Sequence, residues 1–269
     1  MRFVTAAAVW IVALAFLLPF VLGPWHPPQA ITALARQLDD QMTITFVVAA
    51  VIFLVSQAAL GFAVLHFGRK RNEPARYFSH NDRWEMLWTS AAAVLFLSLT
   101  LMGYSAWAEV RFDQARNTTE GEPLTIEVVG QQFIWNFRYP GKDGRFGPVD
   151  PKLIDDSVGN PLGIERDHAD GKDDIVAPRL VVPVNRDVEL LLKAKDVLHN
   201  FFVPELRIKM DTVPGLVGRL PLRADTLGSY EIACSELCGL GHYRMRAFLE
   251  VVSEQDYEAW LSEQASYLQ

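Results

Sequence analysis

Three long uncharged apolar runs dominate the first 108 residues of the chain and constrain its fold more than any other feature. They are Phe3 to Leu22, Thr43 to Phe67 and Met86 to Ala108. Each is about as long as the roughly 20 residues that an α-helix needs to cross a bilayer. The sequence therefore predicts a membrane protein rather than a soluble cytosolic one, with a transmembrane helical hairpin over residues 43–108.

The first apolar run allows two interpretations. Arg2 before an apolar stretch is typical of a signal peptide as well as of a transmembrane helix, and no small-residue A-x-A cleavage pattern stands near Gly23. Residues 1–42 are therefore expected to be a signal peptide or a first transmembrane segment, followed in either case by a linker.

Charge divides the chain into two chemically different halves. Residues 1–107 carry 7 basic and 5 acidic side chains, whereas residues 108–269 carry 18 basic and 27 acidic ones. Five of the basic residues lie between the second and third apolar runs: Arg69, Lys70, Arg71, Arg76 and Arg83. Positive loops stay in the cytoplasm, so residues 109–269 are expected on the periplasmic or extracellular side of a bacterial-type plasma (inner) membrane. The acidic half would repel phosphate, which excludes nucleic acid as a partner.

Short runs rich in β-branched and aromatic residues, separated by Pro and Gly, fill the outer half. They predict strands at Leu124 to Val129, Phe133 to Tyr139, Arg179 to Val184, Val188 to Lys193, Ser229 to Ala233 and Ala247 to Val252. This pattern is typical of an all-β sandwich or a small Greek-key barrel, so the whole chain is expected to be a membrane-anchored α+β protein.

Two other segments interrupt the strand pattern. Residues 140–178 are rich in Gly, Pro and Asp, with 9 acidic and 5 basic side chains, and are expected to form a long loop with a solvated acidic surface. Ser253, followed by Tyr257, Trp260 and Leu261, predicts a capped amphipathic helix at the C-terminus.

Side chains that bind soft metal ions are concentrated in one short segment. Cys234, Cys238, His242 and Met245 supply two thiols, an imidazole and a thioether within 12 residues. Such ligands select copper over Mg²⁺ or Ca²⁺. On an extended strand the two cysteines would be about 13 Å apart, so the chain must turn between them if both bind one centre. His199, near the end of an expected strand, is the candidate for a second imidazole.

Several alternatives remain for these residues. Two cysteines outside the cytoplasm could form a disulfide, and zinc would accept two Cys and two His without needing a Met. A site with two His, one Cys and a weak Met is typical of blue copper, and this sequence has one thiolate more. Two bridging thiolates can hold two copper ions in a closed centre, for which electron transfer is the expected function.

Four segments of the sequence resemble subunit II of the haem-copper cytochrome c oxidases. Three lie in the outer half: Asp196 to Pro204 (DVLHNFFVP), Lys209 to Gly215 (KMDTVPG) and Cys234 to Met245 (CSELCGLGHYRM). The fourth, Asn81 to Thr89 (NDRWEMLWT), resembles the start of that family's second hairpin helix. The match extends over roughly residues 40–262, with the motifs in family order.

The resemblance implies a cupredoxin barrel that carries a dinuclear copper centre, CuA. In that family CuA takes electrons from cytochrome c and passes them to haem in subunit I, where O2 is reduced to water and protons are pumped. The resemblance implies that Cys234 and Cys238 bridge the two coppers. It also implies that His199 and His242 are terminal ligands, and that the Met245 thioether and the Glu236 backbone carbonyl bind weakly.

The resemblance also implies roles beyond the copper ligands. The Glu236 side chain would reach a Mg²⁺ or Mn²⁺ shared with subunit I, which also holds the haem and CuB. Glu85 matches the carboxylate at the mouth of a proton pathway into subunit I, although an acid also suits the start of a helix for electrostatic reasons.

Two positions depart from the family pattern. The aromatic motif Q-W-x-W stands here as Gln132 to Trp135 (QFIW), so Phe133 replaces the Trp at which electrons usually arrive, while Trp135 matches the second Trp. The family's Pro-Gly-Arg ends here in Leu216. The absence of a C-x-x-C-H motif excludes a fused cytochrome c, so the donor is a separate protein or domain.

The acidic outer half suits a basic electron donor such as cytochrome c. Asp196 and Asp211 are the acids expected nearest the copper site, where opposite charge would accelerate encounter. Two other functions remain: a CuA subunit of a nitric oxide reductase, and a membrane-anchored copper carrier. Glu85 and Glu236 favour the oxidase, because a carrier needs neither a proton pathway nor a metal shared with subunit I.

Overall fold

A computed structural model describes residues 2–23, 27–67, 77, 79–108 and 122–266 of the chain. They form two compact units. The first comprises Met1–Pro27 and Gln37–Ala108, and the second comprises Pro28–Arg36 and Glu109–Gln269. Most of the positive loop that predicts membrane orientation, including Arg69, Lys70, Arg71 and Arg76, lies outside the described residues.

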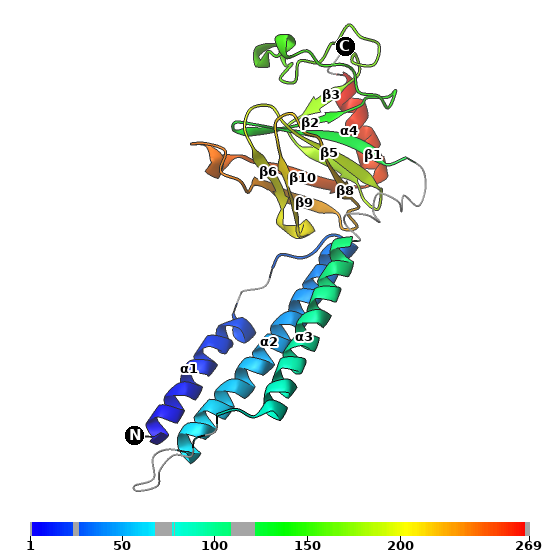
Figure 1. Ribbon diagram of the computed structural model, residues 1–269. Helices are drawn as coiled ribbons and strands as arrows, with labels where there is room; N and C mark the ends of the chain where they lie inside the picture. Colours follow the sequence, from blue (N-terminus) through cyan, green and yellow to red (C-terminus); the bar gives the residue numbers. More distant parts are fainter. Residues whose placement is uncertain (1, 24–26, 68–76, 78, 109–121, 267–269) are drawn as a thin grey trace. The chain divides into compact units, whose positions relative to one another are not determined.

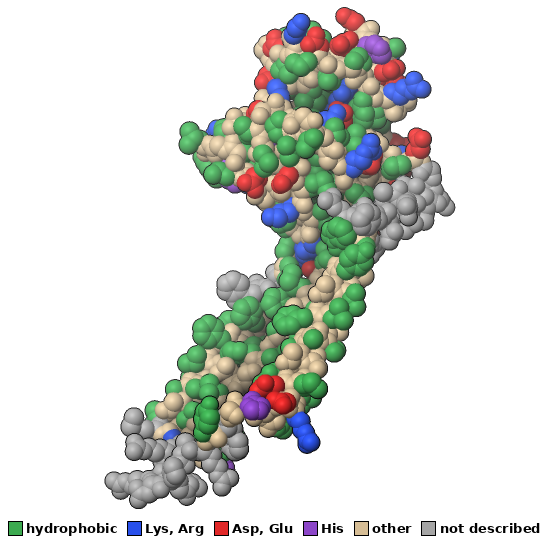
Figure 2. Space-filling view, in the orientation of Figure 1, with side chains coloured by type: hydrophobic (Ala, Val, Ile, Leu, Met, Phe, Trp, Pro, Cys, Tyr) green, Lys and Arg blue, Asp and Glu red, His purple; other side chains and the backbone are tan. Residues whose placement is uncertain are grey.

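Among the residues that the structure describes, three helices are long and apolar enough to cross a membrane: α1 (Arg2–Leu22), α2 (Ala33–His66) and α3 (Asp82–Ala108). Apart from residues 33–36 of α2, which belong to the second unit, all three lie in the first unit. Most of their large apolar side chains are exposed, as expected for surfaces that face lipid, and they cover this unit in Figure 2. The predicted membrane-spanning helices are therefore confirmed by length and composition.

Helix α2 begins at Ala33 and not at Thr43, where its apolar run starts. The Thr32 hydroxyl accepts a hydrogen bond from the Ala35 N–H at 3.0 Å, which caps the helix N-terminus. The first turns carry Arg36, Asp39 and Asp40, so the hydropathy pattern does not show them as helix.

Aromatic side chains of α1 pack on α2: the ring centroids of Phe20 and Phe46 are 6.4 Å apart, and Trp10 makes a second contact. The Trp10 indole N–H donates to the Gln57 carbonyl at 3.2 Å, and the ring lies against Gly61, where a Cβ would overlap it. Close approach of helices at a small residue is typical of membrane bundles. Whether α1 is removed as a signal peptide or kept as a transmembrane helix is not decided by this contact, and both alternatives stay predictions.

The second unit is a sandwich of two 5-stranded sheets (Figure 1). The first sheet has the order β3 (Ile175–Ala177), β2 (Ile134–Tyr139), β1 (Leu124–Gln131), β5 (Val188–Ala194) and β8 (Gly218–Leu222). The second has the order β4 (Leu180–Pro183), β10 (Arg246–Val252), β9 (Gly228–Cys234), β6 (His199–Val203) and β7 (Ile208–Thr212). The pairs β1·β5 and β4·β10 are parallel, and the remaining neighbours are antiparallel.

Alternate residues of the strands build the core between the sheets. In β5, for example, Val188, Leu190 and Leu192 are buried, while the residues between them are partly exposed. The C-terminal helix α4 (Glu254–Ser266) packs on this unit, with the ring centroids of Trp260 and Tyr139 4.9 Å apart. The Ser253 hydroxyl accepts the Asp256 N–H at 3.1 Å, so the predicted helix cap is confirmed.

Some elements differ from the sequence prediction. Strands β3, β6, β7 and β8 were not among the predicted ones, and β2 begins one residue after Phe133. His199 is the first residue of β6, so its expected place near the end of a strand is wrong. Short 3₁₀ helices lie in several connections, at Pro151–Leu153, Asp156–Val158, Pro204–Leu206 and His242–Arg244.

The long acidic loop is anchored by a buried charge cluster on β2. The Arg138 side chain is 2% exposed and lies 3.1 Å from a Glu127 oxygen and 3.1 Å from an Asp174 oxygen. It also donates to the Gly147 carbonyl at 2.6 Å. Burial raises the pKa of Asp174, against hydrogen bonds from Arg138 and the Gly147 N–H that lower it. The predicted solvated surface is therefore wrong for Asp174, which is fully buried.

The segment before α2 belongs to the β unit. Ile31 is 1% exposed; its N–H donates to the Glu205 carbonyl at 3.2 Å, and its carbonyl accepts the Asp225 N–H at 3.0 Å. Arg36 donates to the Asp225 carboxylate at 3.2 Å. These bonds hold residues 31–36 on the sandwich, within the second unit.

Candidate metal centre

The candidate ligands come together at one end of the sandwich. His199 opens β6, Cys234 ends β9, and Cys238, His242 and Met245 lie in the connection between β9 and β10. The chain turns between the two cysteines, as the sequence required. The Ser235 N–H donates to the Asn200 carbonyl at 3.0 Å, and the Cys234 N–H donates to the Met245 carbonyl at 3.2 Å. These two bonds fix the ends of the ligand loop, residues 234–245.

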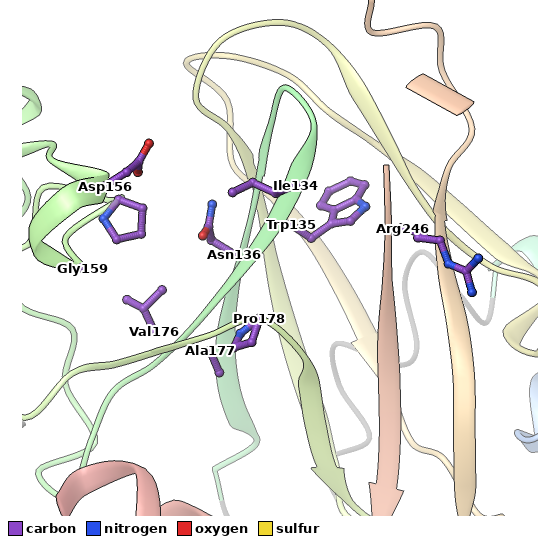
Figure 3. Close-up of a pocket in the computed structure, with 10 residues that line it drawn as sticks. Ile134, Trp135, Asn136, Asp156, Gly159, Val176, Ala177, Pro178 and Arg246 are labelled. Carbon is purple, nitrogen blue, oxygen red and sulfur yellow. The ribbon is translucent and has the colours of Figure 1, made fainter. Parts of the chain in front are cut away.

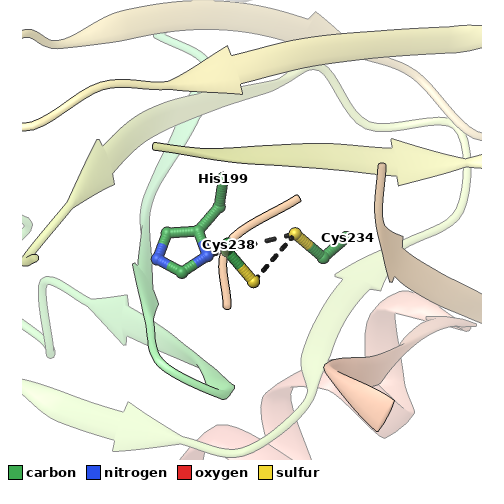
Figure 4. Close-up of side chains that lie close together, drawn as sticks. All are labelled: His199, Cys234 and Cys238. Atoms are coloured by element: carbon green, nitrogen blue, oxygen red, sulfur yellow. Dashed lines mark hydrogen bonds between the residues drawn. The ribbon is translucent and has the colours of Figure 1, made fainter. Parts of the chain in front are cut away.

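Three ligand atoms form the centre of the cluster (Figure 4). The Cys234 and Cys238 sulfurs are 3.7 Å apart, and His199 Nδ1 lies 3.9 Å from the Cys234 sulfur. All three side chains are buried, and their ligand atoms lie within 4.8 Å of one another. A disulfide would need a separation of about 2.05 Å. Both cysteines are free, so the disulfide alternative is wrong.

The other candidate ligands surround the same two sulfurs. His242 Nδ1 and the Met245 sulfur each lie 3.7 Å from the Cys238 sulfur, and the Glu236 carbonyl oxygen lies 3.2 Å from the Cys234 sulfur. Met245 is 2% exposed and directed toward the thiols. The geometry therefore gives each thiol its own imidazole neighbour, His199 for Cys234 and His242 for Cys238.

The chemistry of this set fits copper. Burial, and then the neighbouring Cys234, raise the pKa of the Cys238 thiol to about 11, so a metal ion must displace its proton to bind the thiolate. Sulfur and imidazole ligands suit copper, and a thioether adds nothing that a tetrahedral zinc site uses.

Asp196 lies behind His199. Its carboxylate oxygen Oδ1 is 2.9 Å from His199 Nε2, and its Oδ2 accepts the Gln132 backbone N–H at 2.7 Å. Burial opposes ionisation of Asp196, but hydrogen bonds from Gln132, His199 and Val197 outweigh it and lower the pKa. Sequence reasoning treated Asp196 only as a surface acid and missed this contact.

Sequence reasoning also missed Gln132. Its side-chain Nε2 donates to the Cys238 carbonyl at 2.5 Å, which ties the turn between β1 and β2 to the ligand loop. No local pattern in the sequence indicates this contact, because residues 132 and 238 are brought together only by the packing of the two sheets.

Phe133 packs on the ligand loop. A Cβ at Gly241 would overlap the Phe133 ring, and a Cβ at Gly239 would lie 2.8 Å from Gln132 Nε2. Gly239 also has φ +137°, a conformation that side chains rarely adopt. Glycine is therefore required at both positions for the loop to meet the aromatic ring.

Trp135 connects the metal cluster to a surface pocket. Its ring centroid lies 6.0 Å from that of His199. The same residue lines a pocket of about 540 Å³ at the edge of β2, where Asn136 and Arg246 are also found (Figure 3). Trp135 Nε1 and Asn136 Nδ2 are buried and have no hydrogen-bond partner among the residues that the structure describes.

Three further candidates have side chains that are not part of the cluster. Glu236 is exposed on the ligand loop, and Asp211 is exposed on β7, where it accepts a hydrogen bond from the Asn200 amide at 2.7 Å. Glu85 lies in the first turn of α3, in the helical unit, and accepts the Asn81 N–H at 3.3 Å. This contact at the N-terminus of α3 is enough to explain an acidic residue at position 85.

A two-sheet sandwich with paired cysteines and histidines at one end, in a chain with membrane-spanning helices, defines a membrane-anchored cupredoxin-like protein with a copper-type site. Two family models match: cytochrome c oxidase subunit II, periplasmic domain, over residues 124–252, and its transmembrane domain over residues 26–105. The chain belongs to the cytochrome c oxidase subunit II family, and so is a component of an oxidoreductase complex.

Individual relatives agree with the family models. The chain is 34% identical over 264 residues to an alternative cytochrome c oxidase subunit 2 of Bradyrhizobium diazoefficiens, covering 97% of this chain and 92% of the relative. It is 32% identical to cytochrome c oxidase subunit 2 of Cereibacter sphaeroides, covering 82% and 73%. The crystal structure of the periplasmic domain of subunit II of cytochrome oxidase of Bradyrhizobium japonicum matches with 26% identity and a TM-score of 0.42, covering 56% of this chain and 100% of that one.

Proposed function

We propose that this chain accepts electrons from cytochrome c or a similar basic donor at a dinuclear CuA centre and passes them to haem in subunit I. There O2 is reduced to water with proton pumping. The observation that carries the proposal is the pairing of each thiol with its own imidazole, within 3.9 Å for Cys234 and His199 and 3.7 Å for Cys238 and His242. A single zinc ion would also accept two thiolates and two imidazoles, but it would leave the buried Met245 thioether, 3.7 Å from the Cys238 sulfur, without a role.

The ligand roles follow from these positions. Cys234 and Cys238 would bridge the two coppers, His199 and His242 would bind one each, and Met245 and the Glu236 carbonyl would be weak ligands. When bound, the copper pair would supply a site that takes up and releases one electron. The protein holds the ligands on strand ends and on a loop tied at both ends, which limits their movement when the charge changes.

Burial of the cluster favours electron transfer over copper delivery. His199 is fully buried, and Cys238 and Met245 are 4% and 2% exposed. A copper carrier must release its metal to a partner, which needs accessible ligands. The alternative of a nitric oxide reductase subunit receives no support from the relatives, which are named as cytochrome c oxidase subunits.

Other contacts with the oxidase are part of the same proposal. The exposed Glu236 carboxylate would reach a Mg²⁺ or Mn²⁺ shared with subunit I, and Glu85 would lie at the mouth of a proton pathway in that subunit. The β unit would face the periplasm or the outside of a bacterial-type plasma membrane, in keeping with the description of the family model that it matches.

Electrons would arrive near Phe133 and Trp135. Phe133 covers the ligand loop, and Trp135 lies between the surface pocket and His199. Asp196 and Asp211 would attract the basic donor.

Removal of the thioether tests the weak ligand. Met245→Leu is expected to preserve the fold, because the two side chains have similar volumes and such swaps usually cost less than about 1.5 kcal/mol. The copper site should remain but with an altered reduction potential and slower electron transfer, measured by redox titration and stopped-flow kinetics. Met210→Leu, on β7, is the control. If Met245→Leu leaves the spectrum and potential unchanged, Met245 is a core residue only.

Ionic strength tests donor docking. The association rate of a basic cytochrome should fall steeply between 0.01 M and 0.1 M salt, because the Debye length shrinks from about 30 Å to about 10 Å. Asp211→Asn should lower the rate at low salt and flatten its salt dependence, as measured by stopped-flow reduction of the copper-loaded oxidase. We choose Asp211 because Asp196 also contacts a copper ligand.

An uncharged substitution provides the comparison for that experiment. Phe133→Ala should slow electron transfer by a similar factor at every salt concentration, because it removes apolar contact and leaves the charge unchanged. Rates that do not depend on salt and are unaffected by Asp211→Asn would show that the donor is a fixed partner, and the docking proposal would then fail.

A further inference from the structure

Two residues outside the ligand set hold both halves of the copper site in place. Asp196 contacts His199, on β6, and Gln132 contacts Cys238, on the ligand loop. The two are joined to each other, because the Gln132 backbone N–H donates to Asp196 at 2.7 Å. A continuous chain of hydrogen bonds therefore runs from His199 through Asp196 and Gln132 to Cys238.

From this chain we propose that Asp196 and Gln132 are positioning residues that set the orientation of His199 and the place of Cys238 before copper binds. The proposal rests on the copper centre proposed above. It gives Asp196 a role that does not depend on the electron donor.

The contact with Asp196 selects the tautomer of His199. A carboxylate can only accept hydrogen bonds, so the proton of the neutral imidazole lies on Nε2, the atom 2.9 Å from Asp196. Nδ1 then keeps its lone pair, and this is the atom that faces the Cys234 sulfur at 3.9 Å. Carboxylates behind metal-binding histidines act in this way in many metal sites.

Asparagine cannot replace Asp196. The carboxylate accepts N–H groups from Gln132, Val197 and His199, at 2.7, 2.7 and 2.9 Å. An amide has one acceptor oxygen, and its NH₂ would face another donor in either orientation. The variant must therefore lose the bond to Gln132 or the bond to His199.

The Gln132 side chain acts on the other half of the site. Its amide donates to the carbonyl of Cys238, so it fixes the backbone that carries the second thiol. Gln132→Glu keeps the size and removes the donor, which places a carboxylate against a carbonyl. The neighbouring Gln131 offers a matched control, because its Oε1 accepts from Lys195 at 2.9 Å and a glutamate would preserve that bond.

The test uses the full chain in detergent, loaded with copper and kept free of any electron donor. Copper affinity is measured by competition with a chelator, and the site by its EPR hyperfine pattern. Asp196→Asn and Gln132→Glu should each weaken copper binding by about 10- to 100-fold and alter the hyperfine pattern. Asp143→Asn, at an exposed position in the acidic loop, and Gln131→Glu make the same charge changes and should leave both unchanged.

The two variants change charge in opposite directions, which separates positioning from simple attraction. Charge alone predicts weaker binding of a cation in Asp196→Asn and tighter binding in Gln132→Glu. Tighter binding in Gln132→Glu, or unchanged affinity and spectrum in both variants, would overturn the inference. Gln132 is exposed, so its variant keeps the test valid if Asp196→Asn fails to fold. A wild-type chain that binds no copper pair would instead refute the proposed function.

Discussion

Replacing either Cys234 or Cys238 with serine is expected to abolish the dinuclear centre. A hydroxyl is far less acidic than a thiol and is a poor bridging ligand for copper. Each sulfur also lies within 3.7 to 3.9 Å of the other thiol and of one imidazole, so the loss of either disconnects both halves of the site. Copper content per chain and the visible and EPR spectra measure the effect.

Tyr243→Phe is the control for the cysteine variants. It lies in the same loop, is 85% exposed, and should leave copper content and spectrum unchanged. A serine variant that still binds two coppers with the wild-type spectrum would contradict the assignment of that cysteine as a bridging ligand.

Replacing Arg138 with methionine is expected to destabilise the β unit by about 3 to 5 kcal/mol. The guanidinium is the partner of Glu127 and Asp174, whose side chains are 7% and 0% exposed. Its removal leaves the buried Asp174 carboxylate without the charged group that hydrogen-bonds to it, with only the more distant Arg166 charge nearby. Lys193 still pairs with Glu127, so most of the destabilisation is expected to come from Asp174. Denaturant unfolding of the full chain, followed by tryptophan fluorescence, measures it.

Arg179→Met provides the comparison. Arg179 pairs with Glu250 at 2.8 Å on the surface, with 59% of its side chain exposed, and such pairs contribute less than about 1 kcal/mol. Equal losses of unfolding free energy in the two variants would show that burial of the Arg138 cluster adds no stability. A large loss only in Arg138→Met would explain why the acidic loop is ordered on the sandwich.

The strands that could be predicted are those with a clear alternation or a dense β-branched run, such as Val188–Ala194. Strands β6 and β8 lack that signal, because His199 and Asn200 place polar side chains in β6 and β8 contains Gly218 and Pro221. Strand β7 does alternate apolar residues with lysine and aspartate, but over only 5 residues. These segments become strands because neighbouring strands supply their hydrogen bonds, which is a tertiary effect that local sequence does not encode.

The site could be predicted in its ligand types but not in its supporting contacts. Spacing alone pointed to Cys234, Cys238, His242 and Met245, because soft ligands in one short segment are distinctive. Gln132 is 106 residues from Cys238 and has an ordinary polar side chain, so only the packed sheets reveal their contact. Asp196 was predicted as a docking acid because its charge is visible in the sequence and its hydrogen bond to His199 is not.

The most direct test of the copper centre is EPR spectroscopy of the purified, copper-loaded full chain, combined with metal analysis. We expect two coppers per chain that share one unpaired electron, because paired thiolate bridges favour delocalisation between equivalent ions. The protein should be purple, with a seven-line copper hyperfine pattern. A colourless zinc protein, or a single copper with a four-line pattern, would contradict the account.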